Sequence, residues 1–128
     1  MAIETPDTPD GFLLGARLED RLGRAEGDLR LVTGLGVEEV AAAVTPGGAI
    51  TRYDLVGRAP WRLVGLDGGS LAEGTATAFT GYSATGTTVA TAAAEADARE
   101  RLTVLLADAI VTRLLLLPPD RLAGRALP

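Results

Sequence analysis

An alternation between positions 52 and 63 constrains the fold more than any other feature of this sequence. The apolar or small residues occupy odd positions: Tyr53, Leu55, Gly57, Ala59, Trp61 and Leu63. The charged residues occupy even positions: Arg52, Asp54, Arg58 and Arg62. Because successive side chains of a strand point to opposite faces of a sheet, the pattern predicts one long strand whose odd face packs on a core and whose even face meets solvent.

A second strand is predicted just before it in the sequence. Apolar residues alternate on odd positions over Leu29–Val37 and on even positions over Val40–Val44, which predicts a bulge between about Gly36 and Val40. Pro60 interrupts the central strand itself. Since proline has no N–H to donate to a ladder, we expect an edge, an unpaired position or a bulge at Pro60.

A third strand and two helices complete the pattern. After the hairpin signal Asp67-Gly68-Gly69, residues Leu71–Tyr82 predict a strand with small alanines on one face. Leucines every four residues, at Leu14, Leu18 and Leu22, predict a helix that is capped by Thr8 or Asp10 and ends at Gly23. A longer helix is predicted from about residue 88 to residue 117, where a Pro-Pro pair stops it.

These elements, with a short strand at Ala2–Thr5, predict an α+β fold in which two helices pack on one face of a four-stranded mixed sheet. A length of 128 residues suits one domain. We assign residues 1–117 to that domain and residues 118–128 to a flexible C-terminal tail. In the core, we expect the long helix to place Leu102, Leu106, Ile110 and Leu114 against Leu55, Trp61 and Leu63.

The residue types that are missing exclude several chemistries. The sequence has no Cys, His, Lys, Asn or Gln, so zinc fingers, haem ligation, iron–sulfur clusters and thiol or Ser-His-Asp nucleophiles are excluded. We therefore predict no cofactor and no metal. The net charge of −5 argues against nucleic acid as a partner. A mean hydropathy of +0.22 is high for a small domain and indicates surface that a partner covers.

Two groups of charged residues are candidate sites. Glu95, Asp97 and Glu100 could supply the acid and base of a small carboxylate-dependent hydrolase. Arg52, Arg58 and Arg62 could bind an anionic ligand through bidentate contacts to phosphate or carboxylate groups, as in a periplasmic binding module. Each group has a simpler interpretation as a solvated helix or sheet face.

One combination of segments carries a family resemblance that extends from Ile3 to Leu117. The segments are Ile50–Leu55, Ala59–Leu63, Gly74, the aromatic turn Gly81–Ser83, Ala92–Arg101, Leu106–Ile110 and Arg113–Leu114. In their order and spacing they resemble LptE, the lipopolysaccharide-assembly lipoprotein of Gram-negative bacteria, in its alphaproteobacterial form. The resemblance implies a non-enzymatic α/β sandwich that plugs the LptD β-barrel and helps insert lipopolysaccharide in the outer leaflet.

The resemblance also implies partners, a location and a site. The expected partners are an LptD-like outer-membrane β-barrel and lipopolysaccharide, and the expected location is the periplasmic side of the outer membrane. Family members are held there by a lipidated N-terminal Cys. Because this sequence has no Cys, we expect that the anchor either lies upstream of Met1 or is absent. Basic residues near one end of the sheet are the implied lipopolysaccharide contacts, which makes Arg52 the first candidate, with Arg58 and Arg62 beside it.

Overall fold

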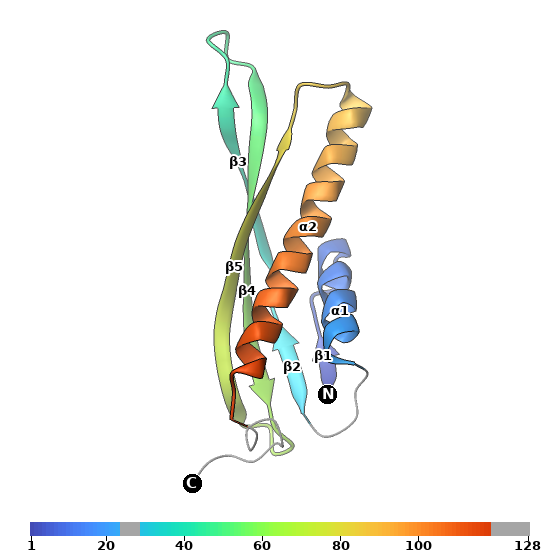
Figure 1. The fold of residues 1–128 in the computed structure, drawn as a ribbon, viewed down its shortest axis with the longest axis vertical. Coiled ribbons are helices and arrows are strands. Elements are labelled where there is room, and N and C mark those ends of the chain that lie inside the picture. Colours follow the sequence, from blue (N-terminus) through green and yellow to red (C-terminus); the bar gives the residue numbers. More distant parts are fainter. Residues whose placement is uncertain (24–28, 119–128) are drawn as a thin grey trace.

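Two helices lie on one side of a five-stranded mixed sheet in the computed structural model, which describes residues 1–23 and 29–118 (Figure 1). The elements in chain order are β1 (Ala2–Glu4), α1 (Pro9–Leu22), β2 (Arg30–Thr33), β3 (Gly36–Val44), β4 (Ile50–Val64), β5 (Ser70–Ser83) and α2 (Thr88–Leu115). The predicted α+β class is confirmed. All of the predicted tail except Pro118 lies outside the described residues.

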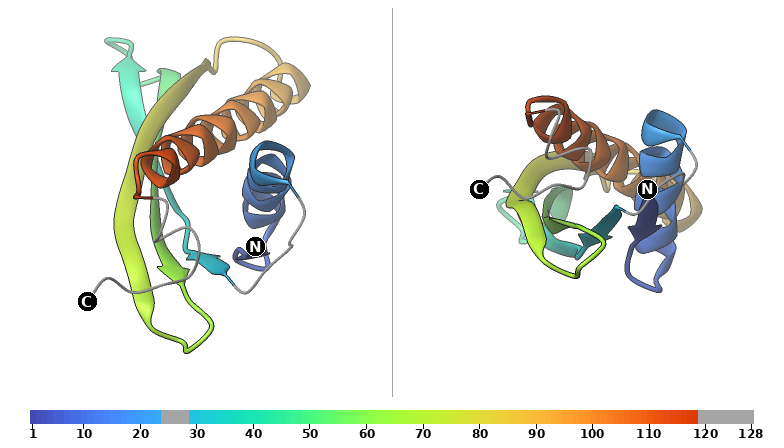
Figure 2. Two further views of the ribbon diagram at one scale, coloured as in Figure 1. Left: turned by 60° about the horizontal axis from the view of Figure 1, so that its bottom comes forward. Right: turned by 90° about the horizontal axis from the view of Figure 1, so that it is seen from below.

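The long strand β4 is the centre of the sheet. On one side it pairs antiparallel with β2 and with β3, and on the other side it pairs antiparallel with β5. The short strand β1 adds to β2 in parallel, which makes the sheet mixed. Figure 2 shows the sheet curving around the side on which the helices lie.

The fifth strand arises because the strand predicted over residues 29–44 is divided opposite Pro60. β2 and β3 keep one register against β4, from Arg30↔Val64 through Gly36↔Arg58. Between them, the N–H of Gly34 donates to the carbonyl of Pro60 at 2.8 Å, but Pro60 has no N–H to return the bond. Pro60 stays in register opposite Thr75 of β5, so of the three predicted alternatives the structure shows a position at which one ladder hydrogen bond is missing.

The bulge predicted between Gly36 and Val40 is wrong. Pairing with β4 stays in step from Gly36 to Ala41, and the register shifts fall between Ala41 and Val44. The change of apolar parity in the sequence has a different cause. β3 is an edge strand that is largely exposed on both faces, so Val40 is 44% exposed beside polar neighbours.

The core lies between the sheet and the two helices, with contributions from α1, the second half of α2, β2, β4 and β5. Leu102, Leu106, Ile110 and Leu114 are each at most 1% exposed, and they belong to one cluster with the buried residues Leu55, Trp61 and Leu63, as predicted. The close approach of α2 requires a glycine beneath it. A Cβ atom on Gly57 would lie 2.9 Å from a methyl group of Leu106.

Both helices are capped at their N-termini by a threonine, which for α1 is one of the two predicted residues. The Thr8 hydroxyl accepts from the N–H of Gly11 at 3.0 Å, and the Thr87 hydroxyl accepts from the N–H of Ala90 at 3.1 Å. Gly23, with φ of 79°, ends α1 as predicted. α2 ends at Leu115, two residues before the predicted end at Leu117.

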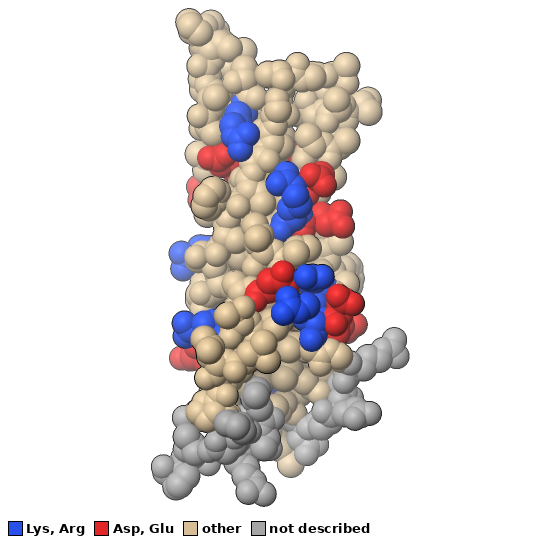
Figure 3. Space-filling view, in the orientation of Figure 1, with Lys and Arg blue, Asp and Glu red and all other residues tan. Residues whose placement is uncertain are grey.

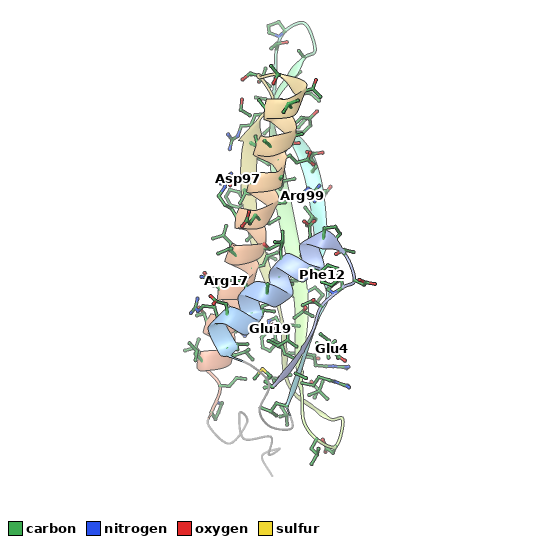
Figure 4. The ribbon with its side chains drawn as sticks, turned by 90° about the vertical axis from the view of Figure 1, so that its right-hand side faces the viewer. Glu4, Phe12, Arg17, Glu19, Asp97 and Arg99 are labelled. Atoms are coloured by element: carbon green, nitrogen blue, oxygen red, sulfur yellow. The ribbon has the colours of Figure 1, made fainter. Side chains whose placement is uncertain are left out.

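Ion pairs fasten α1 to α2. Asp108 of α2 accepts from Arg17 Nε at 3.1 Å and from Arg21 Nη1 at 2.8 Å, and Arg99 Nη1 lies 3.0 Å from Asp10 Oδ2. The hydrogen bond from Arg17 is the main reason why the pKa of Asp108 lies below its ordinary value. Figure 4 shows α1 lying across α2 with Arg17 on the side toward α2.

Candidate functional site

One end of the molecule, as far as residues 1–23 and 29–118 show, carries no charged side chain. It is formed by residues 40–51, which include the β3–β4 hairpin, and by residues 82–94, which include the end of β5, the loop after it and the first turns of α2. We call this region the charge-free end. Its two parts lie together, because the N–H of Ala84 donates to the carbonyl of Thr51 at 2.9 Å. In Figure 3 the upper part of the visible face has neither blue nor red atoms.

The hairpin at this end has a defined shape. The N–H of Thr45 donates to the carbonyl of Ala49 at 2.8 Å, and the N–H of Gly48 donates to the carbonyl of Thr45 at 2.9 Å. The hydroxyl of Thr45 also accepts from the N–H of Ala49 at 3.1 Å. Gly48 has φ of 88°, a conformation that glycine adopts without strain. The hairpin is therefore preformed for contact.

Large apolar side chains are exposed across the charge-free end. The exposed fraction is 44% for Val40, 59% for Val44, 37% for Ile50 and 80% for Val89. Single exposed apolar residues are ordinary in soluble proteins. Val40, Val44 and Ile50 are exposed on the β3–β4 hairpin and Val89 on α2. Several exposed apolar side chains on one uncharged end are typical of surface that another molecule covers.

An aromatic pair lies at the base of this end, on the helix side of the sheet. The rings of Tyr53 and Tyr82 stack with centroids 5.4 Å apart, and the Tyr82 hydroxyl donates to the Glu39 carboxylate. Burial of Tyr82 and this hydrogen bond both raise its pKa above the ordinary tyrosine value. The hydrogen bond between Tyr82 and Glu39 thus links β5 to β3 across β4, next to the charge-free end.

The three candidate arginines lie on the outer face of β4, away from the helices. Arg52 borders the charge-free end, and its Nε lies 3.6 Å from Asp54 Oδ1. Within the described residues, neither Arg58 nor Arg62 makes an ion pair. Arg58 lines an open hollow with Glu38, and Arg62 lines another with Glu73. The structure places the three in a row along one strand and does not gather them into a single pocket.

The candidate carboxylates of α2 do not face one another across a cleft. Glu95 Oε1 lies 3.3 Å from Arg99 Nε, and Asp97 Oδ2 lies 2.9 Å from Arg101 Nε, so both are in ion pairs along the helix. Among residues 1–23 and 29–118, no acidic cluster could hold a metal ion. The helices of this part of the chain also include none with the length and apolar character needed to cross a membrane.

The charge-free end was not predicted from the sequence. The uncharged run Gly74–Ala94 is long enough to span a membrane, but its eight Ser or Thr residues make it too polar for that. It is the first part of the signal. The shorter uncharged run Val40–Thr51 is the second part of the signal. Only the pairing of β3, β4 and β5 shows that the two runs meet at the same end.

The fold and its uncharged, partly apolar end define a small α+β protein suited to contact with another molecule. Residues 1–114 match the family model LptE, described as lipopolysaccharide-assembly. The chain belongs to the LptE family. This family consists of non-enzymatic lipopolysaccharide-assembly lipoproteins of the bacterial envelope, which confirms the prediction that the chain is not an enzyme.

Solved structures share the fold. A protein from Caulobacter crescentus described as a lipoprotein has a TM-score of 0.70 and 24% identity, over 88% of this chain and 85% of its own. Rare lipoprotein B from Shewanella oneidensis has a TM-score of 0.66 and 16% identity, over 89% and 92% of the two chains. A minor lipoprotein from Acinetobacter baumannii has a TM-score of 0.65 and 16% identity, over 88% and 87%. Among curated protein sequences, none matches this chain.

Proposed function

We propose that this chain is the plug subunit of an LptD-like β-barrel, and that it helps insert lipopolysaccharide into the outer leaflet of the outer membrane. The observation that carries the proposal is the charge-free end. Membership of the LptE family supports the lipopolysaccharide-assembly role. The charge-free end supports the particular way in which the subunit meets its partner.

Charged side chains lose their hydration when they are enclosed by a partner, and the centres of protein interfaces are accordingly poor in charge. Residues 40–51 and 82–94 include no charged side chain, so a partner can enclose this end without desolvating a charge. Val44 and Val89 are exposed there and provide apolar area to bury. The molecule is elongated, with the β3–β4 hairpin at one tip (Figure 1). A narrow uncharged tip suits a concave partner such as the lumen of a barrel.

The location follows from the same role. We propose that the protein acts as a lipoprotein on the periplasmic side of the outer membrane. The lipoprotein character of the family supports this placement. In this arrangement the charge-free end extends into the barrel.

Co-purification of the cognate barrel tests the proposal. Val44→Asp introduces a charge at the charge-free end, whereas Leu66→Asp introduces the same charge in the β4–β5 turn at the opposite end, where Leu66 is 76% exposed. We expect wild type and Leu66→Asp to retain the barrel and Val44→Asp to lose most of it. Absence of the barrel from the wild-type preparation, or equal retention by both variants, would contradict the proposal.

The arginines of β4 are proposed as lipopolysaccharide contacts. Arg58 and Arg62 are exposed, and within the described residues no carboxylate pairs with either, so both are available to phosphate groups. Arg52 is partly neutralised by Asp54. Because Arg58 lies six residues from Arg52, roughly 20 Å along a strand, the arginines would contact separate phosphates.

Binding of purified lipopolysaccharide tests this second part. Replacement of Arg58 and Arg62 by Ala should weaken binding more than Arg52→Ala does, and raised salt should weaken binding of the wild type. Replacement of Arg113, a basic residue of α2, serves as the control. If the control variant loses as much binding as the Arg58 and Arg62 variant, the assignment of the site to β4 fails.

A further inference from the structure

The outer edge of β5 is an open strand edge over its middle part. The hydrogen bond from Ala84 N to Thr51 O fixes which residues of β5 direct their backbone toward β4, and these are the even-numbered ones. The odd-numbered residues therefore direct their N–H and C=O groups away from β4. Within the described residues, no strand pairs with that side of β5.

The two free edges of the sheet differ in their protection. The outer edge of β3 carries Glu38 and Glu39 and is distorted by the register shifts between Ala41 and Val44. Residues 74–80 of β5 have no charge, no proline and no register shift. Charges, prolines and bulges are the usual means of preventing edge-to-edge pairing. Because residues 74–80 have none of these, this stretch of β5 is open to another strand.

The open stretch has a polar boundary at each end. At one end, Arg101 Nη2 donates to the carbonyl of Gly81 at 3.4 Å from the free side, and at the other end stands the carboxylate of Glu73. Between these boundaries, Thr75, Thr77 and Phe79 present unpaired backbone groups. Phe79 is 74% exposed, and Leu105 of α2, which is 47% exposed, lines the same hollow beside the edge.

We propose that β5 pairs with β5 of a second copy of this chain, antiparallel and about a two-fold axis at Thr77. In this register Thr77 faces Thr77, and Thr75 faces Phe79 of the second copy, so the free backbone groups of all three residues are paired. Glu73 then lies opposite Gly81, beside Arg101 of the second copy, and the same contact recurs at the other end. This self-complementarity of charge and register selects a second copy as the occupant.

The proposed dimer is weak. An edge contact of this length, with only Phe79 and Leu105 as large apolar groups, is smaller than a standard protein interface. We therefore expect dissociation constants on the order of hundreds of micromolar, with a dimer at high concentration and a monomer at low concentration. The inference does not depend on the proposed function, because it concerns the isolated chain.

Sedimentation equilibrium of the purified protein tests the pairing. Thr77→Pro removes an N–H that faces the free edge and leaves the ladder to β4 intact, whereas Thr77→Val keeps that N–H. We expect Thr77→Val to dimerise like wild type and Thr77→Pro to weaken the dimer roughly tenfold or more. A wild type that stays monomeric up to about 1 mM, or a dimer that Thr77→Pro leaves unchanged, would overturn the proposal.

Charge reversal tests the register independently of the proline variant. Glu73→Arg and Arg101→Glu should each weaken the dimer, and the double variant should restore it, because the two residues exchange roles across the two-fold axis. Amide exchange should show concentration-dependent protection at Thr75, Thr77 and Phe79. Failure of the double variant to restore dimerisation would overturn this register. Protection that arises in a monomer only upon addition of the barrel would assign the edge to the partner instead.

Discussion

The two ends of this molecule differ in how the helices cover the sheet and in their charge. At the end that holds α1, the sheet is covered by both helices, leucines fill the core, and Asp108 binds two arginines of α1. At the charge-free end, the β3–β4 hairpin has no helix over its tip, and Val44 and Val89 are exposed. Buried leucines and ion pairs between the helices are therefore concentrated at one end of the long axis, and the uncharged surface lies at the other. Substitutions should accordingly affect stability at one end and association at the other.

The largest effect on stability is expected in the core. Leu106→Ala removes a side chain that is 0% exposed and should lower the free energy of unfolding by about 2–5 kcal/mol. Val44→Ala, at the charge-free end, should change it by less than about 0.5 kcal/mol, since Val44 is 59% exposed. Urea denaturation measures both. Equal losses in the two variants would remove the distinction between the ends.

A smaller loss is expected at the base of the charge-free end. Tyr82→Phe removes the hydrogen bond to Glu39 and should cost about 1–2 kcal/mol at neutral pH. Because the folded-state pKa of Tyr82 is raised, its neutral form stabilises the fold. That contribution is complete below about pH 10 and is lost as the pH rises toward the folded-state value. The difference in the free energy of unfolding between wild type and Tyr82→Phe should therefore decrease as the pH is raised. A constant difference above pH 10 would contradict the assignment.

Loss of the ion pairs that Asp108 makes with Arg17 and Arg21 should lower the free energy of unfolding by less, and with the opposite pH dependence. The folded-state pKa of Asp108 is lowered by Arg17 and Arg21, so its ionised form stabilises the fold. The contribution is present above about pH 4 and is lost as the pH falls through the folded-state value. Asp108→Asn should destabilise the protein at pH 7 more than Asp20→Asn does, because Asp20 pairs only within α1. Thermal unfolding at pH 7 and in acid would show whether the difference disappears as expected.

The region that defines the fold could be predicted from the sequence because its physics is local and periodic. The alternation around Trp61 specified both faces of β4, and Thr8, Thr87 and Gly23 marked helix ends through their own side-chain or backbone chemistry. The division of the second strand depended on what lies opposite Pro60. Which residue lies opposite Pro60 depends on how distant parts of the chain pair. The sequence could therefore give only three alternatives for Pro60, and it could not show that Gly34 lies opposite it.

The candidate site was less predictable for the same reason. Arg52, Arg58 and Arg62 were visible because charge alternates along one strand, and their role in lipopolysaccharide binding stays a prediction. The charge-free end depends on two sequence runs that meet only through the pairing of β3, β4 and β5. Misplacement of the bulge has a related origin, because the exposure of β3 on both faces changes its apolar pattern between Gly36 and Ala41, where the register against β4 does not change.

Labelling of single cysteines tests most directly whether a partner encloses the charge-free end. The chain has no cysteine, so Val44→Cys, Val89→Cys and Leu66→Cys each provide one unique thiol. In the isolated protein all three should react with a water-soluble maleimide at similar rates, because all three side chains are exposed. In the purified complex with the barrel, we expect strong protection at positions 44 and 89 and continued reaction at position 66. Equal labelling at all three positions in the complex would contradict this expectation.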